Sequence, residues 1–150
     1  MWITPAGRGT AETVKLPGGG EAMLVDDAYN ANPESMRAAI DVLAGVAGQK
    51  LLALGDMGEL GAEAPKYHAE IGAYARAAGI NRLYALGEAS KHTVAAFGAG
   101  AQHFPRIEDM LPEIENALAS DATLLVKGSR FMQMERVVQA FAQKETSTCC

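Results

Sequence analysis

A chain of 150 residues is long enough for one domain with its own core, and 49% of its residues are hydrophobic while 21% are charged. Its apolar runs are too short to span a membrane, and a net charge of -5 with scattered lysines and arginines argues against a nucleic-acid surface. We therefore expect a globular protein with no membrane and no nucleic-acid partner. The start, MWITPAGRGT, lacks the features of a secretory signal, which predicts a cytoplasmic location.

The chain begins with a predicted linker and a β-hairpin. Residues 1–12 are expected to be linker, and strands are expected at residues 13–16 and 22–25, on either side of a glycine-rich break. Apolar runs around such a break are typical of a hairpin. The domain itself is expected to span residues 13–143.

Strands and helices then alternate. Pro33 begins a helical pattern that Asn32 is suited to cap, with its apolar residues on one face. Further strands are expected at residues 51–55, 82–87, 102–104 and 123–126, and further helices at residues 62–78, 90–97, 107–118 and 131–141. This alternation predicts an α/β fold, a three-layer Rossmann-like sandwich whose mostly parallel sheet carries helices on both faces.

In such sheets ligands bind beyond the carboxyl ends of the strands, where loops lead into helices. Four loops therefore define the candidate site, at residues 26–32, 55–61, 87–89 and 127–130. We name three of them the Asp27 loop (26–32), the Asp56 loop (55–61) and the Lys127 loop (127–130).

The Asp27 loop, within DDAYNANPES, is unusually polar for a connection. Asp27 could accept hydrogen bonds from a ribose diol, and Tyr29 could border a base. Asn30 and Asn32 could bond a heterocycle or a substrate amide. Turn and cap chemistry explains the same residue types, most directly for Asn32, which precedes a helix.

The Asp56 loop, within LGDMGELG, has three glycines spaced by three around Asp56 and Glu59. Glycine allows a ligand to approach the main chain closely. The two carboxylates could receive the ammonium group of an amino acid or dipeptide. A capped helix start is the alternative interpretation.

The Lys127 loop combines Lys127, Ser129 and Arg130 just before a helix expected to begin at Phe131. A helix N-terminus beside two cations favours a carboxylate or phosphate. The alternative is that Ser129 only caps this helix and that Arg130 is solvated.

Other patterns are informative because they are absent. His68, His92 and His103 lack the spacing of metal ligands, so each is expected to be a surface or partly buried histidine and no metal site is predicted. The adjacent Cys149 and Cys150 define no disulfide framework, and residues 144–150 are expected to be a disordered tail. Neither a P-loop nor a dinucleotide fingerprint occurs, so this domain alone is not expected to hold a triphosphate firmly.

Three strings in these loops carry a family resemblance. DDAYNANPESM, LGDMGELG followed by HAEIG, and LLVKGSRFMQMERVV occur in this order, and the resemblance runs from about Gly7 to Phe141. The chain resembles the C-terminal domain of the Mur ligase family. DDAYNANP, rather than a loop with a basic residue or a histidine, is similar to the member that adds a dipeptide.

The resemblance implies a three-domain, ATP-dependent amide-bond ligase that adds D-alanyl-D-alanine to UDP-MurNAc-tripeptide in peptidoglycan synthesis. An N-terminal domain would bind the uridine nucleotide, and a central P-loop domain would hold most of the ATP and magnesium. The precursor carboxylate would be phosphorylated by ATP, and the dipeptide amine would then attack the acyl phosphate. This domain alone is expected to contain no catalytic residue and to be inactive.

The resemblance also assigns residue roles. Arg8 is similar to the arginine that ends the interdomain linker and reaches ATP phosphate. The expected ATP-contacting residues are Arg8, Asp27, Tyr29, Asn30 and Asn32. The expected acceptor-binding residues are Asp56, Glu59, Lys127, Ser129 and Arg130.

Two other interpretations remain open from sequence. Asp26, Asp27, Asp56 and Lys127 all end expected strands and resemble the acidic pair, phosphoacceptor and lysine of a receiver domain, although glycine rather than proline follows Lys127. The domain could also be an inert docking module. The ligase assignment of the site residues depends on one last expectation: Tyr29, Asp56 and Lys127 must lie on one rim of the sheet, close enough to share one substrate.

Overall fold

The computed structural model describes residues 10–16 and 19–146, which form one six-stranded sheet and five α-helices. The strands are β1 (Thr10–Lys15), β2 (Glu21–Asp27), β3 (Gln49–Gly55), β4 (Arg82–Leu86), β5 (Ala101–Phe104) and β6 (Ala122–Lys127). The helices are α1 (Pro33–Ala44), α2 (Ala64–Ala77), α3 (Ser90–Phe97), α4 (Ile107–Ala117) and α5 (Glu135–Thr146). Two 3-10 turns are η2 (Gly61–Glu63) and η3 (Arg130–Met132).

The strand order is β1-β2-β6-β3-β4-β5. β1 and β2 form the antiparallel hairpin expected from sequence, and every other neighbouring pair is parallel. β6, the last strand in the chain, lies in the middle of the sheet between β2 and β3, and all six of its residues are buried. This central position brings the Lys127 loop between the Asp27 loop and the Asp56 loop.

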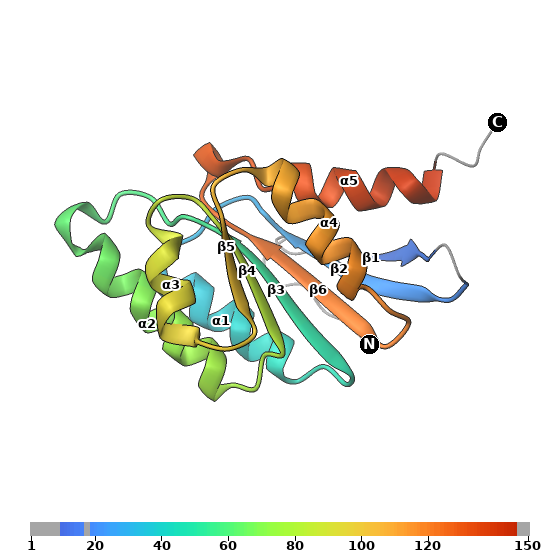
Figure 1. Cartoon of the computed structure of the whole chain (residues 1–150), viewed down its shortest axis with the longest axis horizontal. Coiled ribbons are helices and arrows are strands. Elements are labelled where there is room, and N and C mark those ends of the chain that lie inside the picture. The colour runs from blue at the N-terminus through green and yellow to red at the C-terminus, as the bar shows by residue number, and fades with distance from the viewer. Residues whose placement is uncertain (1–9, 17–18, 147–150) are drawn as a thin grey trace.

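Helices cover both faces of the sheet (Figure 1). On one face, the strands pack against α4 and α5 through a core that includes Met110, Ile114 and Val137. On the other face, the core includes Ile40 of α1 and Ile71 of α2. The three-layer α/β sandwich predicted from the alternation of elements is therefore confirmed.

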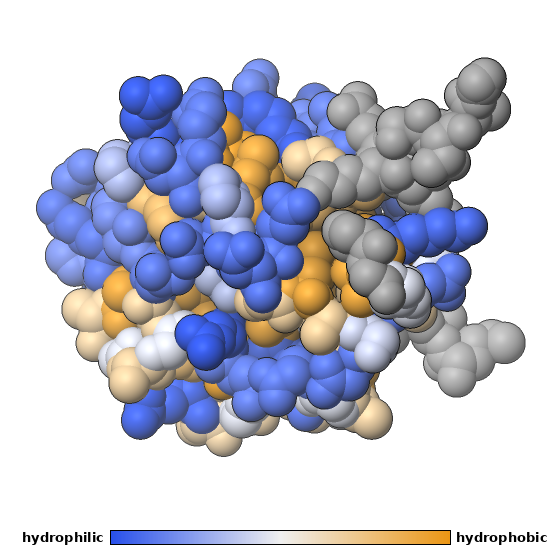
Figure 2. Space-filling view, turned by 45° about the vertical axis from the view of Figure 1, so that its right-hand side comes forward, coloured by the Kyte–Doolittle hydropathy of each residue, from blue (hydrophilic) through white to orange (hydrophobic). Residues whose placement is uncertain are grey.

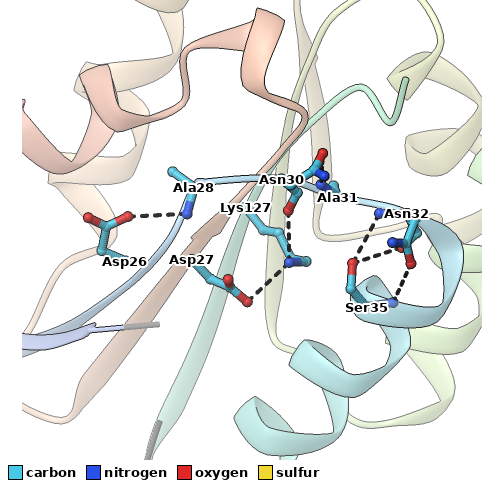
Figure 3. Close-up of polar contacts among 8 residues, drawn as sticks. All are labelled: Asp26, Asp27, Ala28, Asn30, Ala31, Asn32, Ser35 and Lys127. Atoms are coloured by element: carbon cyan, nitrogen blue, oxygen red, sulfur yellow. Dashed lines mark hydrogen bonds and ion pairs between the residues drawn. The ribbon is translucent and has the colours of Figure 1, made fainter. Parts of the chain in front are cut away.

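Most helix and strand bounds lie within three residues of those expected, because strong local patterns set them. α1 illustrates this: Pro33 is at its first turn, and the Asn32 side chain accepts a hydrogen bond from the Ser35 backbone N–H at 2.8 Å. The Ser35 hydroxyl in turn accepts from the Asn32 backbone N–H, which completes a capping box (Figure 3).

The last helix begins later than predicted. We expected a helix from Phe131, but residues 130–132 form a 3-10 turn, Gln133 has a left-handed φ of 53°, and α5 starts at Glu135. The break lets Met134 enter the core, where a Cβ on Gly128 would lie 2.5 Å from its Cγ. Packing of Met134 against this glycine therefore overrides the local helical pattern.

The expected domain bounds also differ from the elements. β1 begins at Thr10, within the expected linker, and α5 continues to Thr146, past the expected end at residue 143. Arg8, Cys149 and Cys150 lie outside the described residues. Among the residues that are described, no helix has the length and apolar character required to cross a membrane.

Candidate functional site

The three polar loops share one rim of the sheet. In the parallel register Asp27 of β2 is paired with Lys127 of β6, and Lys127 is also level with Leu54 at the end of β3. The Ser129 backbone N–H donates to the Asp56 carbonyl at 3.1 Å, which joins the Lys127 loop to the Asp56 loop. Convergence of the three loops, on which the sequence interpretation depended, is thus confirmed.

Lys127 links the Asp27 loop to the central strand β6 (Figure 3). Its side chain is 2% exposed, and Nζ lies 3.1 Å from Asp27 Oδ2 and donates to the Asn30 carbonyl at 2.9 Å. A buried ammonium needs such partners because desolvation disfavours an isolated charge. The expectation that Lys127 and Arg130 sit together at a helix N-terminus is wrong, since α5 begins only at Glu135 and Arg130 is exposed in η3.

Tyr29 and Arg130 form the outer part of the rim. Tyr29 is 58% exposed, and the Arg130 guanidinium carbon lies 5.2 Å from the centre of its ring, in cation–π range. An open hollow of about 410 Å³ beside them is lined by Asp26, Ala28, Tyr29, Arg130, Gln133 and Glu135. This part of the rim offers a ring face, a cation and carboxylates to a ligand.

The two asparagines of the first loop are partly committed to the backbone. The Asn32 amide oxygen caps α1, so the cap interpretation of this residue is confirmed. The Asn30 amide oxygen accepts from the next backbone N–H, of Ala31, at 2.8 Å. Both side chains are exposed, and both keep an NH₂ group with which to meet a ligand.

Asp56 is a cap for a distant helix. Its carboxylate accepts three hydrogen bonds from the start of α3, donated by Ala89 N at 3.0 Å, Ser90 N at 2.8 Å and Ser90 Oγ at 2.7 Å. A Cβ on Gly87, whose φ is 117°, would lie 2.5 to 2.7 Å from this carboxylate. We predicted that Asp56 receives an ammonium group or caps a helix in its own loop; the helix it caps is one that begins 34 residues later.

Below the Asp56 loop lies a buried histidine. His68 of α2 is 2% exposed, Nε2 accepts from the Met57 backbone N–H at 3.0 Å, and Nδ1 lies 2.7 Å from the Ala64 carbonyl oxygen. Our expectation of a surface or partly buried histidine was therefore wrong. The signal was its place in HAEIG, which begins seven residues after the end of LGDMGELG.

Glu59 and Ser129, at this end of the rim, each have an unusual feature. Glu59 is exposed with a left-handed φ of 60°, a conformation uncommon for a residue other than glycine. Ser129 is 4% exposed, and its Oγ has no hydrogen-bond partner among the described residues. Buried hydroxyls nearly always have a partner, so the unpaired Ser129 Oγ is an exception in the described structure.

No group of three or more histidine, cysteine, aspartate or glutamate side chains is arranged to hold a metal ion in the described part of the chain. The three loops provide hydrogen-bonding groups, the exposed Arg130 guanidinium and the Tyr29 ring. Groups of these kinds can bind and orient a ligand.

Comparison with known proteins places this arrangement in a family. Residues 12–130 match the family model described as Mur ligase, glutamate ligase domain. The UDP-N-acetylmuramoyl-tripeptide--D-alanyl-D-alanine ligase of Escherichia coli (strain K12) is 43% identical over 129 residues, which are 85% of this chain and 28% of that protein. The protein of the same name from Bacillus subtilis (strain 168) is 31% identical over 135 residues, 83% of this chain and 29% of that one.

Solved structures agree. Crystal structure I of MurF from Acinetobacter baumannii has a TM-score of 0.81 at 29% identity, covering 94% of this chain and 31% of that one. MurF ligase from Thermotoga maritima shares the fold, with a TM-score of 0.79 at 22% identity over 99% of this chain and 33% of that one. The chain thus spans about a third or less of the length of these proteins, and it belongs to the Mur ligase family.

Proposed function

We propose that this chain is the C-terminal, substrate-positioning domain of an ATP-dependent ligase that joins D-alanyl-D-alanine to UDP-MurNAc-tripeptide in peptidoglycan synthesis. The observation that carries the proposal is the meeting of three polar loops at one rim of the sheet, at the ends of β2, β6 and β3. The 43% identity to the Escherichia coli ligase of that name supports the choice of dipeptide and precursor. A cytoplasmic location goes with this proposal.

The Asp27 loop would bind the nucleotide. Lys127 orients the Asp27 carboxylate, which we propose accepts hydrogen bonds from the ribose, and the exposed Tyr29 ring would border the base. The Asn30 and Asn32 amides would complete this side, and Arg8 would reach the ATP phosphates. Magnesium and most of the triphosphate would be held by a central domain elsewhere in the enzyme.

The other two loops would hold the dipeptide. We propose that Arg130 and the free Ser129 hydroxyl bind its carboxylate and that Glu59 borders its ammonium group. Lys127 and Asp56 belong in the acceptor site as positioning residues, because their charged groups already bond Asp27, Asn30 and the start of α3. This assignment refines the roles expected for them from sequence.

The chemistry supplied here would be orientation. The dipeptide amine must meet an acyl phosphate formed from the precursor, and well-oriented pairs gain about 7 to 11 kcal/mol over free encounter. Closure of this domain on the N-terminal and central domains would align the amine and shield the acyl phosphate from water. We therefore expect neither ATP hydrolysis nor ligation by this chain alone.

Titration of the purified chain, followed by ¹H–¹⁵N NMR, tests the proposal. D-Alanyl-D-alanine should shift amide signals of residues 57–61 and 128–131, and ADP should shift those of residues 27–32, each with a dissociation constant near 1 mM, about -4 kcal/mol. Arg130→Gln should remove the dipeptide response, whereas Arg82→Gln, an exposed arginine at the opposite end of the sheet, should keep it. Shifts scattered over the surface, or none, would favour the inert docking module.

The receiver-like alternative is disfavoured by two observations. The Asp56 carboxylate, which would be the phosphoacceptor, is 9% exposed as a residue and already accepts three hydrogen bonds from α3. The Lys127 ammonium group bonds Asp27, which lies on β2, two strands away from the strand β3 that precedes Asp56. Incubation with acetyl phosphate and magnesium should accordingly add no phosphoryl mass to Asp56.

A further inference from the structure

The chemistry of its two partners fixes the tautomer of His68. A backbone N–H can only donate, so Nε2, which faces Met57 N, must be the unprotonated acceptor. A carbonyl oxygen can only accept, so Nδ1, which faces Ala64 O, must carry the proton. The ring is therefore neutral, with its proton on Nδ1, and both nitrogens are used.

These two bonds connect the Asp56 loop to α2. Ala64 is the first residue of the helix that carries His68, so the Nδ1 bond fixes the ring against its own helix. Nε2 is then presented to Met57, which is 4% exposed and lies in the middle of the loop. An imidazole held in this way acts as a rigid support beneath one peptide group.

That peptide group is where the loop contacts its neighbours. The residue before Met57 is Asp56, whose carbonyl accepts from Ser129 N and whose carboxylate caps α3. The residues after it lead to Glu59 with its left-handed backbone. Displacement of Met57 would therefore move Asp56, Glu59 and Ser129 relative to one another.

We propose that His68 is a positioning residue of the ligand-binding rim, which sets the Asp56 loop and, through Asp56, the Ser129 backbone by accepting the Met57 N–H. The identity of the bound ligand rests on the proposed function. The support of the loop by His68 does not.

Packing alone does not account for this residue. A leucine or phenylalanine would fill the same space, but it would leave the Met57 N–H and its loop without this acceptor. The donor and the acceptor of the imidazole point to different elements, α2 and the loop, so each can be removed separately by substitution.

A pair of substitutions separates the two bonds. In His68→Gln the Oε1 atom can take the place of Nε2 and accept from Met57, whereas in His68→Asn the shorter amide can reach only the Ala64 carbonyl. Histidine and asparagine have similar helix propensities, so neither variant should fail for lack of helix. His92→Asn, on α3 and bonded to no loop through its ring in the described structure, is the matched control.

Amide hydrogen exchange of the purified chain measures the support directly. We expect the Met57 and Ser129 amides to exchange at least tenfold faster in His68→Asn, and at close to the original rate in His68→Gln and His92→Asn. Equal exchange in the Gln and Asn variants would overturn the proposal. In the unsubstituted chain, long-range ¹H–¹⁵N correlation should show the Nδ1-protonated tautomer, and an Nε2-protonated ring would overturn it without any variant.

Titration of the same samples with the dipeptide measures whether the support of the loop affects ligand affinity. D-Alanyl-D-alanine should bind about tenfold more weakly to His68→Asn and regain its affinity in His68→Gln. If the unsubstituted chain binds no dipeptide, the proposed function fails while the exchange result still decides the role of His68. Dipeptide affinity unchanged in His68→Asn, with Met57 exchange increased, would show that the loop does not position the ligand and would overturn the proposal.

Discussion

The two ends of the sheet are held together by different means. At the carboxyl ends of the strands, buried polar side chains bond one loop to another: Asp56, His68, Ser90 and Lys127 are all less than a tenth exposed, and each has its charge or hydrogen bonds directed to another loop or helix. At the amino ends, the turns are joined mainly by backbone hydrogen bonds, such as Gln49 N to Asp121 O at 2.9 Å.

The carboxyl rim buries polar groups, which is energetically unfavourable unless each of them has a partner. Burying polar groups stabilises a fold only if each is fully paired, so a rim built from them is sensitive to small changes. A rim of backbone bonds and exposed side chains tolerates change. The carboxyl rim also carries the exposed Tyr29 ring with the Arg130 guanidinium over it. On the face shown in Figure 2, hydrophobic residues are interspersed among hydrophilic ones.

The largest difference in stability between the rims should come from substituting one lysine at each of them. Lys127→Met leaves the partly buried Asp27 without its ion pair, and loss of one partner of a buried pair costs about 3 to 5 kcal/mol. Lys50→Met removes only an exposed contact from Nζ to the Gly48 carbonyl, so it should change stability by less than about 0.5 kcal/mol. Denaturant unfolding measures both, and equal values would remove the contrast between the rims.

Two glycines with left-handed backbones give the next comparison. Gly87 at the carboxyl rim and Gly79 at the amino rim have φ values of 117° and 91°, so alanine is strained at both. A Cβ on Gly87 would collide with the Asp56 carboxylate, whereas nothing lies within 4 Å of one on Gly79. Gly87→Ala should therefore be less stable than Gly79→Ala by about 1 to 3 kcal/mol in thermal or denaturant unfolding. Equal losses would mean that the Asp56 cap moves aside freely.

Exposed asparagines should behave alike at the two rims. Asn32 accepts from Ser35 N at 2.8 Å, and Asn81 accepts from Lys50 N at 2.8 Å. Each alanine substitution should cost about 1 kcal/mol, because each removes one acceptor from an exposed backbone donor. A cost at Asn32 several times that at Asn81, measured by the same unfolding method, would show that exposed groups also distinguish the rims.

The smallest effect concerns an exposed pair on the carboxyl rim. The hydrogen bond from Lys91 holds the pKa of Glu88 below its ordinary value, helped by the charge of Lys91. Any stability from this shift is present above the ordinary glutamate pKa and is lost as the pH falls through the lowered one. Lys91→Met should raise the Glu88 pKa in an NMR titration without a measurable change in stability, since the pair is solvated. A clear loss of stability at neutral pH would contradict this.

Much of the fold follows from local sequence patterns. Apolar runs set the strands, Asn32 and Pro33 set the start of α1, and the order of strands and helices predicted which rim carries the polar loops. These features depend on residues a few positions apart, whose spacing already determines which face or end of an element they occupy. The loop strings were equally local, and they were sufficient to reveal the family.

Tertiary structure determined which partner each polar side chain of the site bonds. Lys127 meets Asp27 across 100 residues because β6 inserts between β2 and β3, and Asp56 meets Ser90 across 34 residues because the Asp56 loop lies beside the start of α3. The late start of α5 arises in the same way, since the burial of Met134 beside Gly55 and Gly128 outweighs a helical pattern. Sequence spacing supplies the residues of such contacts, but only the order of strands and the packed core determine which of them face one another.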